Sequence, residues 1–188
     1  MQALVYKSTG SWYTVRTEAG KLVQARMKGR FKVGGLTSTN PIAVGDVVEL
    51  EPDNEVEQTY VITSIHDRRN YINRQSPHRR HQHHIVAANI DQSVLLITLR
   101  APRTSQGFID RFLIASEAYH IPSILVCNKA DIYTKEEMEQ FEEWRQMYGA
   151  IGYPMFLLSM QTGAGLQELK NLLKDKISLL SGHSGVGK

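Results

Sequence analysis

Cysteine and long apolar runs are scarce in this sequence of 188 residues, and each shortage excludes a class of protein. A single cysteine, Cys127, excludes an internal disulfide framework and fits a reducing compartment. No apolar run reaches the roughly 20 residues that a membrane-spanning helix requires. The N-terminal residues lack the basic segment followed by an apolar segment that is typical of a secretory signal peptide. We therefore expect a cytoplasmic protein without a membrane partner.

Charge of one sign is not in large excess either, because 22 lysines and arginines face 19 aspartates and glutamates. The basic side chains nevertheless gather between Arg68 and His84, which favours a phosphate-rich partner such as RNA. A second basic run begins at Arg26, where a solvated strand face is an equal alternative. The histidines within residues 78–84 could share a metal ion, but a flexible basic linker is the simpler interpretation, so we predict no metal site in this chain. The predicted RNA-contacting residues are Arg26, Lys28, Arg30, Arg68, Arg69, Arg74, Arg79 and Arg80.

Residues 1–70 contain short segments rich in β-branched and aromatic residues, separated by glycine and proline turn signals. Five short strands with a glycine-rich loop after the third fit a closed barrel of the OB type. An SH3-like barrel fits the pattern nearly as well. The predicted strands cover residues 3–6, 12–17, 21–27, 46–50 and 59–65.

From residue 85 onward, strand candidates alternate with segments of helical spacing, which predicts an α/β domain with a parallel sheet. The predicted organisation is therefore an OB-type RNA-binding domain over residues 1–70, a basic linker over residues 71–84, and an α/β domain over residues 85–188. The strand candidates of the second domain lie at residues 85–89, 93–99, 121–127, 154–158 and 176–180, and the helix candidates at residues 108–120, 135–148 and 166–173.

A phosphate-loop pattern occupies residues 182–188, which read G-H-S-G-V-G-K and match G-x-x-x-x-G-K. The apolar strand candidate before them is the context that such a loop requires. Glycines let backbone N–H groups converge on phosphate oxygens, and Lys188 would supply a positive charge to the β and γ phosphates. A glycine-rich surface turn is the alternative interpretation.

A guanine-reading pattern, N-K-x-D, occupies residues 128–131 and follows another apolar strand candidate. Asp131 can accept hydrogen bonds from the ring N–H and the exocyclic amine of guanine, and adenine offers neither in that arrangement. We expect Asn128 to hold the loop and reach the base, and the stem of Lys129 to cover the ring face. An aspartate that caps a helix is the alternative.

A third segment, L-S-M-Q-T-G-A-G-L at residues 158–166, lies between a strand and a helix candidate and would turn Ser159 toward the guanine oxygen. The order and spacing of all three segments predict that the nucleotide is GTP. In ordinary GTPases the phosphate loop precedes the guanine element, whereas here it comes last, which predicts a circularly permuted GTPase. The predicted GTP-binding residues are Asn128, Lys129, Ala130, Asp131, Ser159, Met160, Gly182, His183, Ser184, Gly185, Val186, Gly187 and Lys188.

The sequence resembles the RsgA or YjeQ family of ribosome-small-subunit-dependent GTPases over nearly its whole length. Besides the nucleotide motifs, the resemblance is carried by G-R-F at residues 29–31, V-G-D-V-V at 44–48, A-A-N-I-D-Q at 87–92 and I-D-R-F-L at 109–113. It implies an OB domain that binds ribosomal RNA, a circularly permuted P-loop GTPase domain and a C-terminal zinc-binding domain. It also implies a role in late maturation of the small ribosomal subunit, with GTP hydrolysis stimulated by that subunit.

The resemblance further implies GTP or GDP with Mg²⁺ as ligands, Zn²⁺ only in the C-terminal domain, and a monomer that binds the small subunit and its rRNA. The sequence departs from the family pattern at Lys188, after which the Mg²⁺-binding Ser or Thr, the switch segments and the zinc ligands do not occur. We therefore expect residues 1–188 alone to bind guanine nucleotide poorly and to be inactive, and we assign no catalytic residue. The alternatives are a non-enzymatic RNA-binding module with a vestigial nucleotide fold, and a different permuted GTPase.

Overall fold

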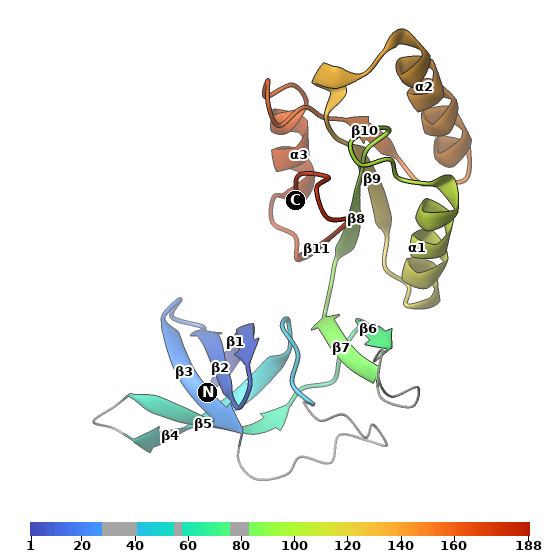
Figure 1. The fold of residues 1–188 in the computed structure, drawn as a ribbon. Coiled ribbons are helices and arrows are strands. Elements are labelled where there is room, and N and C mark those ends of the chain that lie inside the picture. Colours follow the sequence, from blue (N-terminus) through green and yellow to red (C-terminus); the bar gives the residue numbers. More distant parts are fainter. Residues whose placement is uncertain (28–40, 55–57, 76–82) are drawn as a thin grey trace. The chain divides into compact units, whose positions relative to one another are not determined.

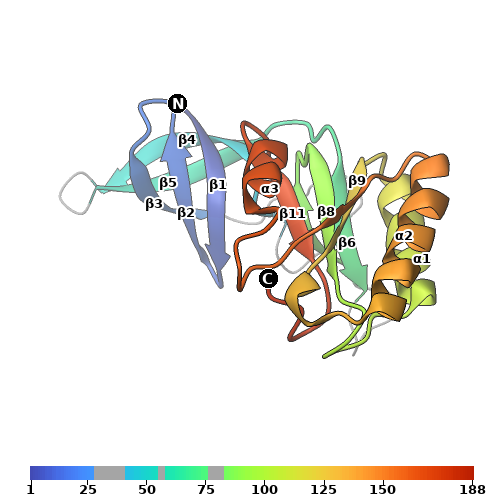
Figure 2. The same cartoon turned by 90° about the horizontal axis from the view of Figure 1, so that it is seen from above.

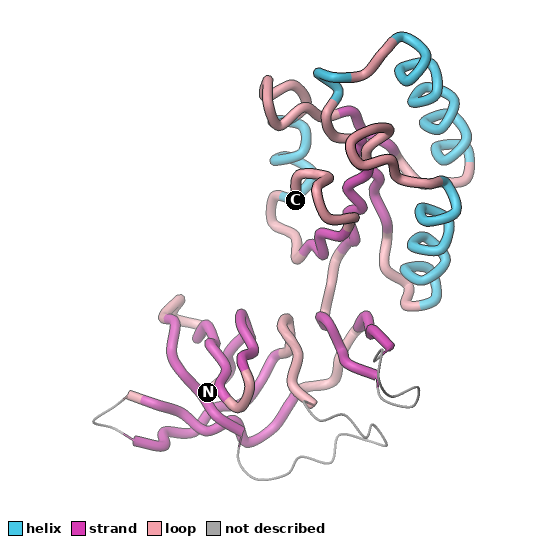
Figure 3. Tube along the Cα trace, viewed as in Figure 1, coloured by secondary structure: helices cyan, strands magenta, loops and turns pink. Residues whose placement is uncertain are grey.

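The computed structural model describes residues 1–27, 41–54, 58–75 and 83–188. The chain divides into two compact units, Met1–Asn89 and Ile90–Lys188 (Figure 1). The described part of the first unit contains strands and loops, whereas helices and strands alternate in the second (Figure 3). The predicted fold class, an all-β domain followed by an α/β domain, is confirmed.

The first unit contains a closed five-stranded barrel with the strand order β1-β2-β3-β5-β4. The barrel closes where β1 pairs antiparallel with β4, and β3 pairs parallel with β5. This topology is that of the OB fold, so the predicted OB-type barrel is confirmed over the SH3-like alternative. The strands are β1 (Gln2–Thr9), β2 (Trp12–Thr17), β3 (Leu22–Met27), β4 (Val47–Asn54) and β5 (Thr59–Ile65).

Strict alternation of side chains fills the barrel. Along β2, Tyr13 and Val15 are buried in the interior while Trp12 and Arg16 are exposed. Inward residues of the other strands, such as Val5 and Ile62, complete a single apolar core. Since successive residues of a strand point to opposite faces, one buried face per strand is what a small barrel requires.

A two-stranded sheet follows the barrel, formed by β6 (Tyr71–Gln75) and β7 (His83–Ala88) in antiparallel pairing. Both strands fall in the first unit. They occupy the described ends of the segment for which we predicted a basic linker, and residues 76–82, with Arg79 and Arg80, lie outside the described residues. The structural division therefore falls after Asn89, a few residues beyond the predicted end of the linker.

Gly45 brings the segment before β4 against the backbone of β7. Its φ is +91°, and a Cβ at this position would lie 2.0 Å from the carbonyl oxygen of Ala88. The Asn89 side chain donates to the Gly45 carbonyl oxygen at 2.8 Å and accepts from the Arg69 backbone N–H at 2.8 Å. Only glycine combines this conformation with this close approach.

A buried ion pair joins the same region to the end of the barrel. Asp46 is fully buried, and its carboxylate accepts two hydrogen bonds from the Arg68 guanidinium, each of 2.7 Å, and one from the Ala43 N–H. Arg68 also donates to the carbonyl oxygen of Pro41 at 2.6 Å, and its side chain is only 9% exposed. The RNA contact of Arg68 stays a prediction, and in the structure its guanidinium neutralises a buried carboxylate.

The second unit is built on a four-stranded parallel sheet with the order β10-β9-β8-β11. The predicted parallel sheet is confirmed, since a helix separates each strand from the next along the chain. The candidate strand at residues 85–89 does not join this sheet, because it forms part of β7 in the antiparallel pair. Figure 2 shows the sheet with helices on both sides. The strands are β8 (Gln92–Ile97), β9 (Ser123–Cys127), β10 (Met155–Leu157) and β11 (Ser178–Ser181).

Both faces of this sheet are covered, which explains why its strands are apolar runs rather than alternating ones. Helices α1 (Gln106–Ala118) and α2 (Lys135–Ala150) pack on the face that carries Leu95 and Ile97. Helix α3 (Leu166–Leu173) packs on the opposite face. No helix within the described ranges combines the length and apolar character needed to cross a lipid bilayer.

Replacing Arg68 with methionine should lower the free energy of unfolding of the first unit by about 3–5 kcal/mol, because the Asp46 carboxylate would remain buried without its counter-charge. Urea denaturation of the 188-residue chain measures the change. Fluorescence in a Trp144→Phe background reports the first unit alone, since Trp12 lies in the first unit and Trp144 in the second.

Arg26→Met is the matched control. Arg26 also forms a two-bonded ion pair, with Asp53 at 2.8 and 3.1 Å, but its side chain is 55% exposed. Loss of this pair should cost about 1 kcal/mol or less. If Arg68→Met destabilised the first unit no more than Arg26→Met, the buried pair would not have the role assigned to it.

Candidate nucleotide-binding site

Three loops of the second unit leave the sheet at one edge. Residues 128–131 follow β9, residues 158–165 follow β10 and residues 182–188 follow β11. Because the four strands are parallel, their carboxyl ends lie at the same edge, which is where open α/β sheets bind ligands. The structure thus brings together the three segments that the sequence analysis assigned to GTP.

The Asn128 side chain links all three loops. It is 2% exposed, its amide nitrogen donates to the carbonyl oxygen of Val186 at 2.8 Å, and its amide oxygen accepts from the Met160 N–H at 3.1 Å. A Cβ at Gly187 would lie 2.4 Å from the same amide nitrogen, and Gly187 has a φ of +90°. The phosphate loop therefore requires glycine at this position in order to approach Asn128.

Asp131 and Ser159 form the second connection between loops. The buried Ser159 hydroxyl donates to Asp131 Oδ1 at 2.5 Å and accepts from the Thr162 N–H at 3.1 Å. Asp131 itself is exposed, and its Oδ2 accepts no hydrogen bond from the residues that the structure describes. The serine orients the carboxylate and leaves one oxygen available to a ligand.

One apolar side chain of the phosphate loop packs into the core of the second unit. Val186 is fully buried in the core cluster that also contains Val94 and Leu96. Gly182 lies so close to the sheet that a Cβ would be 2.4 Å from the carbonyl oxygen of Leu96. Within this loop, all of whose residues are described, the N–H of Val186 donates to the carbonyl oxygen of His183, and the N–H groups of the other six residues donate to no acceptor among the described residues.

Such a set of unpartnered N–H donors beside a lysine fits the chemistry of a phosphate group. The Lys188 ammonium donates to the carbonyl oxygens of Gly182 and His183 at 2.8 and 2.7 Å, so it lies over the loop. His183 packs its ring against Phe108 of α1, with 3.9 Å between the ring centroids. This ring contact connects the phosphate loop to α1.

The connection between β8 and α1, residues 98–105, contacts two of the three loops, and sequence reasoning missed it. The Lys129 ammonium donates to the carbonyl oxygen of Ala101, and a Cβ at Gly185 would lie 3.4 Å from Pro102. The buried Thr104 shapes this connection by donating its N–H to Thr98. No motif marks the segment, because its role depends on backbone carbonyl position and not on side-chain chemistry.

Ala130 begins a single 3₁₀ turn, η1 (Ala130–Ile132), and its N–H donates to the carbonyl oxygen of Leu158 at 3.0 Å. Lys129, just before this turn, has a φ of +69°, a left-handed conformation that only a few non-glycine residues adopt. The turn therefore presents Asp131 toward the Ser159 loop.

The predicted RNA-contacting residues are less completely described. Arg26 pairs with Asp53 on the exposed surface of the barrel, and Arg69 donates to the carbonyl oxygen of Asn89 at 3.1 Å. Arg74 lies on β6. Lys28, Arg30, Arg79 and Arg80 lie outside the described residues, so the RNA-contacting set stays a prediction. Among the described residues, no group of three or more His, Cys, Asp or Glu side chains could hold a metal ion.

A parallel sheet with helices on both faces, whose guanine-type loop precedes a phosphate loop in the chain, defines a P-loop domain of permuted order. Comparison with known proteins gives the family. The family model of the RsgA N-terminal domain matches residues 2–61, and that of the RsgA GTPase matches residues 65–188. The chain belongs to the RsgA GTPase family.

Individual relatives agree with this assignment. A protein of Flavobacterium psychrophilum named small ribosomal subunit biogenesis GTPase RsgA is 49% identical, over 100% of this chain and 58% of that protein. A protein of the same name from Bacteroides fragilis is 46% identical, over 100% of this chain and 60% of that protein. The chain thus spans about three fifths of the length of the curated relatives it matches.

Two solved structures share the fold. The crystal structure of YjeQ from Thermotoga maritima superposes with a TM-score of 0.81 and 34% identity, over 100% of this chain and 62% of that one. The structure of YloQ, described as a circularly permuted GTPase, gives a TM-score of 0.74 and 26% identity, over 99% of this chain and 61% of that one. The permuted order predicted from the motifs is that of this structural class.

Two glycines of one loop provide a matched test of the site's backbone. Gly163 and Gly165 have similar φ values, +82° and +75°, but a Cβ at Gly163 would meet open space while one at Gly165 would lie 2.3 Å from the carbonyl oxygen of Leu157. Gly163→Ala should cost about 1 kcal/mol of unfolding free energy for its conformation alone. Gly165→Ala should cost roughly 3 kcal/mol, because the backbone of β10 must also move.

Urea denaturation of the 188-residue chain in a Trp12→Phe background, followed by the fluorescence of Trp144 in the second unit, measures both changes. Equal destabilisation by the two alanines would contradict the close approach of the loop to β10.

Proposed function

We propose that the protein binds GTP and hydrolyses it as a factor in late maturation of the small ribosomal subunit. The observation that carries this proposal is the hydrogen bonding of Asn128, which joins a guanine-type loop to a phosphate-type loop. Membership of the RsgA GTPase family supports the same activity. Relatives of the chain are named small ribosomal subunit biogenesis GTPases, which supports the subunit as partner.

Guanine would be read by Asp131, whose carboxylate would accept hydrogen bonds from the ring N–H and the exocyclic amine. Ser159 would hold that carboxylate in place and turn its loop toward the guanine oxygen. The stem of Lys129 would cover the ring face. Asn128 would hold the loops together through its side-chain amide, and Ala130 and Met160 would shape the pocket through the backbone. A base that lacks the matching N–H groups would leave a desolvated carboxylate unpaired, which can reduce affinity by roughly 10⁴-fold.

The phosphates would be bound by the N–H groups of residues 182–188 and by the ammonium of Lys188. Mg²⁺ would accompany the nucleotide and neutralise charge on the β and γ phosphates. Catalysis would consist of positioning and charge stabilisation and not of covalent chemistry. We name no residue that activates water, and Zn²⁺ stays a prediction that no described residue tests.

Contact with ribosomal RNA would involve the barrel and the basic residues near its end, of which Arg26 and Arg69 are described on the surface. The OB fold commonly presents such a surface to oligonucleotides. We propose that the protein acts as a monomer in the cytoplasm. Salt should weaken the interaction steeply if phosphate contacts dominate it.

Purified small ribosomal subunits should stimulate GTP hydrolysis by the full-length protein, whereas ATP should not be hydrolysed. Phosphate release measured with and without subunits tests this expectation. Turnover that subunits leave unchanged would keep a permuted GTPase and contradict the ribosomal role. No turnover in either condition, with RNA binding intact, would favour a non-enzymatic RNA-binding module.

Asp131→Asn should lower the affinity of the full-length protein for GTP by about 100-fold, because a charged acceptor becomes an amide. The same change should raise the affinity for XTP, since xanthine carries a carbonyl group where guanine carries its amine. Asp175→Asn is the matched control, because Asp175 lies before β11, at the sheet edge opposite the three loops. Competition binding measures the GTP and XTP affinities of the wild-type protein and of the two variants. Unchanged GTP affinity in Asp131→Asn would contradict the role assigned to Asp131.

A further inference from the structure

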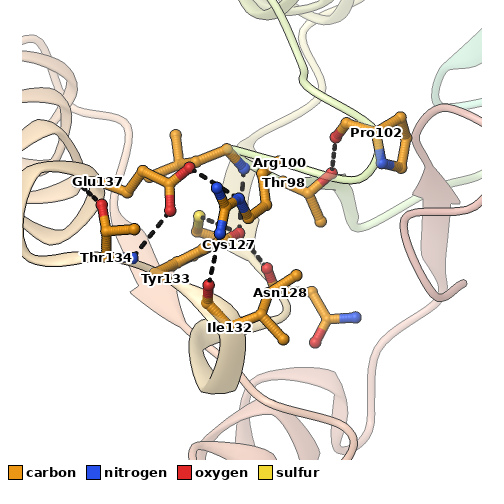
Figure 4. Close-up of polar contacts among 10 residues, drawn as sticks. Thr98, Arg100, Pro102, Cys127, Asn128, Ile132, Tyr133, Thr134 and Glu137 are labelled. Carbon is orange, nitrogen blue, oxygen red and sulfur yellow. Dashed lines mark hydrogen bonds and ion pairs between the residues drawn. The ribbon is translucent and has the colours of Figure 1, made fainter.

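The side chain of Tyr133 hydrogen-bonds back to the first residue of the guanine-type turn. Tyr133 comes directly after η1, the turn that carries Asp131, and its hydroxyl donates to the carbonyl oxygen of Asn128 (Figure 4). The same hydroxyl accepts from the backbone N–H of Leu99 at 3.0 Å. One hydroxyl thus joins the first residue of the turn to the connection between β8 and α1.

The protonation state of this hydroxyl suits the role. Burial is the main cause that raises the pKa of Tyr133 well above its ordinary value, so the group keeps its proton and donates it. Cys127, whose sulfur lies 3.4 Å away, also stays neutral because burial raises the pKa of its thiol to about 11. The contact with Asn128 is therefore a neutral hydrogen bond that does not change near neutral pH.

A second set of contacts fixes the residues on either side of Tyr133. The Arg100 guanidinium pairs with Glu137 at 3.2 Å and donates to the carbonyl oxygen of Ile132 at 3.4 Å. Glu137 in turn accepts from the Thr134 N–H at 2.9 Å, and Thr134 accepts from the Glu137 N–H, which forms a capping box at the start of α2. Figure 4 shows these side chains around the Tyr133 ring.

We propose that Tyr133 is a positioning residue for guanine recognition: its hydroxyl closes the turn of residues 128–133 and so fixes the Asp131 carboxylate against the base. The proposal rests on the proposed function, since it names a further determinant of the same site. Two parallel hydrogen bonds accepted by one carboxylate tolerate little displacement. The second of them, donated by the exocyclic amine, is the one that distinguishes guanine from hypoxanthine.

The test compares the affinities of the full-length protein for GDP and for IDP, whose hypoxanthine base lacks the exocyclic amine. Tyr133→Phe removes only the hydroxyl. It should weaken GDP binding by about tenfold, because the turn loses the hydrogen bond from the Tyr133 hydroxyl to the Asn128 carbonyl oxygen. IDP binding should weaken less, so the ratio of the two dissociation constants should move toward one.

Tyr153→Phe is the matched control. The Tyr153 hydroxyl is likewise a hydrogen-bond donor, here to the carboxylate of Glu117 at 3.3 Å, but it lies outside the three loops. This variant should leave both affinities and their ratio unchanged. Should Tyr133→Phe fail to fold, Arg100→Met tests the same turn, because the Arg100 side chain is 49% exposed and its loss should shift the ratio in the same direction.

The outcomes separate the two proposals. If the wild-type protein binds GDP no better than ADP, the proposed function fails and the role of Tyr133 fails with it. If the wild-type protein prefers GDP but Tyr133→Phe weakens GDP and IDP equally, or neither, the function stands and Tyr133 has only a structural role. A selective loss of GDP binding at an unchanged melting temperature supports the positioning role.

Discussion

The buried amide of Asn128 is the contact on which the rest of the candidate site depends. Its nitrogen and its oxygen hydrogen-bond to two different loops, Val186 in one and Met160 in the other, while its own backbone belongs to the third. A side-chain amide is one of the few groups that can donate and accept at once in this way. One side chain therefore fixes the geometry of three loops that α2 and α3 separate along the chain.

The sequence predicted the fold and the three loops well, because each motif follows an apolar strand and parallel strands end at one edge. Alternation of strand and helix specified the second unit, and turn signals specified the barrel. The contribution of Tyr133 could not be predicted, since its hydroxyl acts on a backbone carbonyl and no pattern of letters records where that carbonyl lies. The contact of Ala101 with Lys129 could not be predicted for the same reason, because Ala101 accepts the hydrogen bond through its backbone carbonyl oxygen.

Charge patterning was the least reliable guide. Arg68 stands beside Arg69 in a basic stretch, so the sequence places both with RNA, yet only the fold reveals that Arg68 faces the buried carboxylate of Asp46. A carboxylate without solvent needs a cation, and the nearest arginine in space supplies it. The clustering of charged residues along the sequence therefore does not distinguish a structural arginine from a ligand-binding one. The solvent exposure of each side chain in the fold is also required.

The burial of Val186 has a consequence for any ligand of residues 182–188. A glycine-rich loop would ordinarily sample many conformations, and a ligand would have to order it at the expense of its own affinity. Here an apolar side chain anchors the loop in the core beneath the sheet edge. The loop is preorganised: its entropy is lost when the chain folds, so affinity and residence time can be set by the ligand contacts themselves.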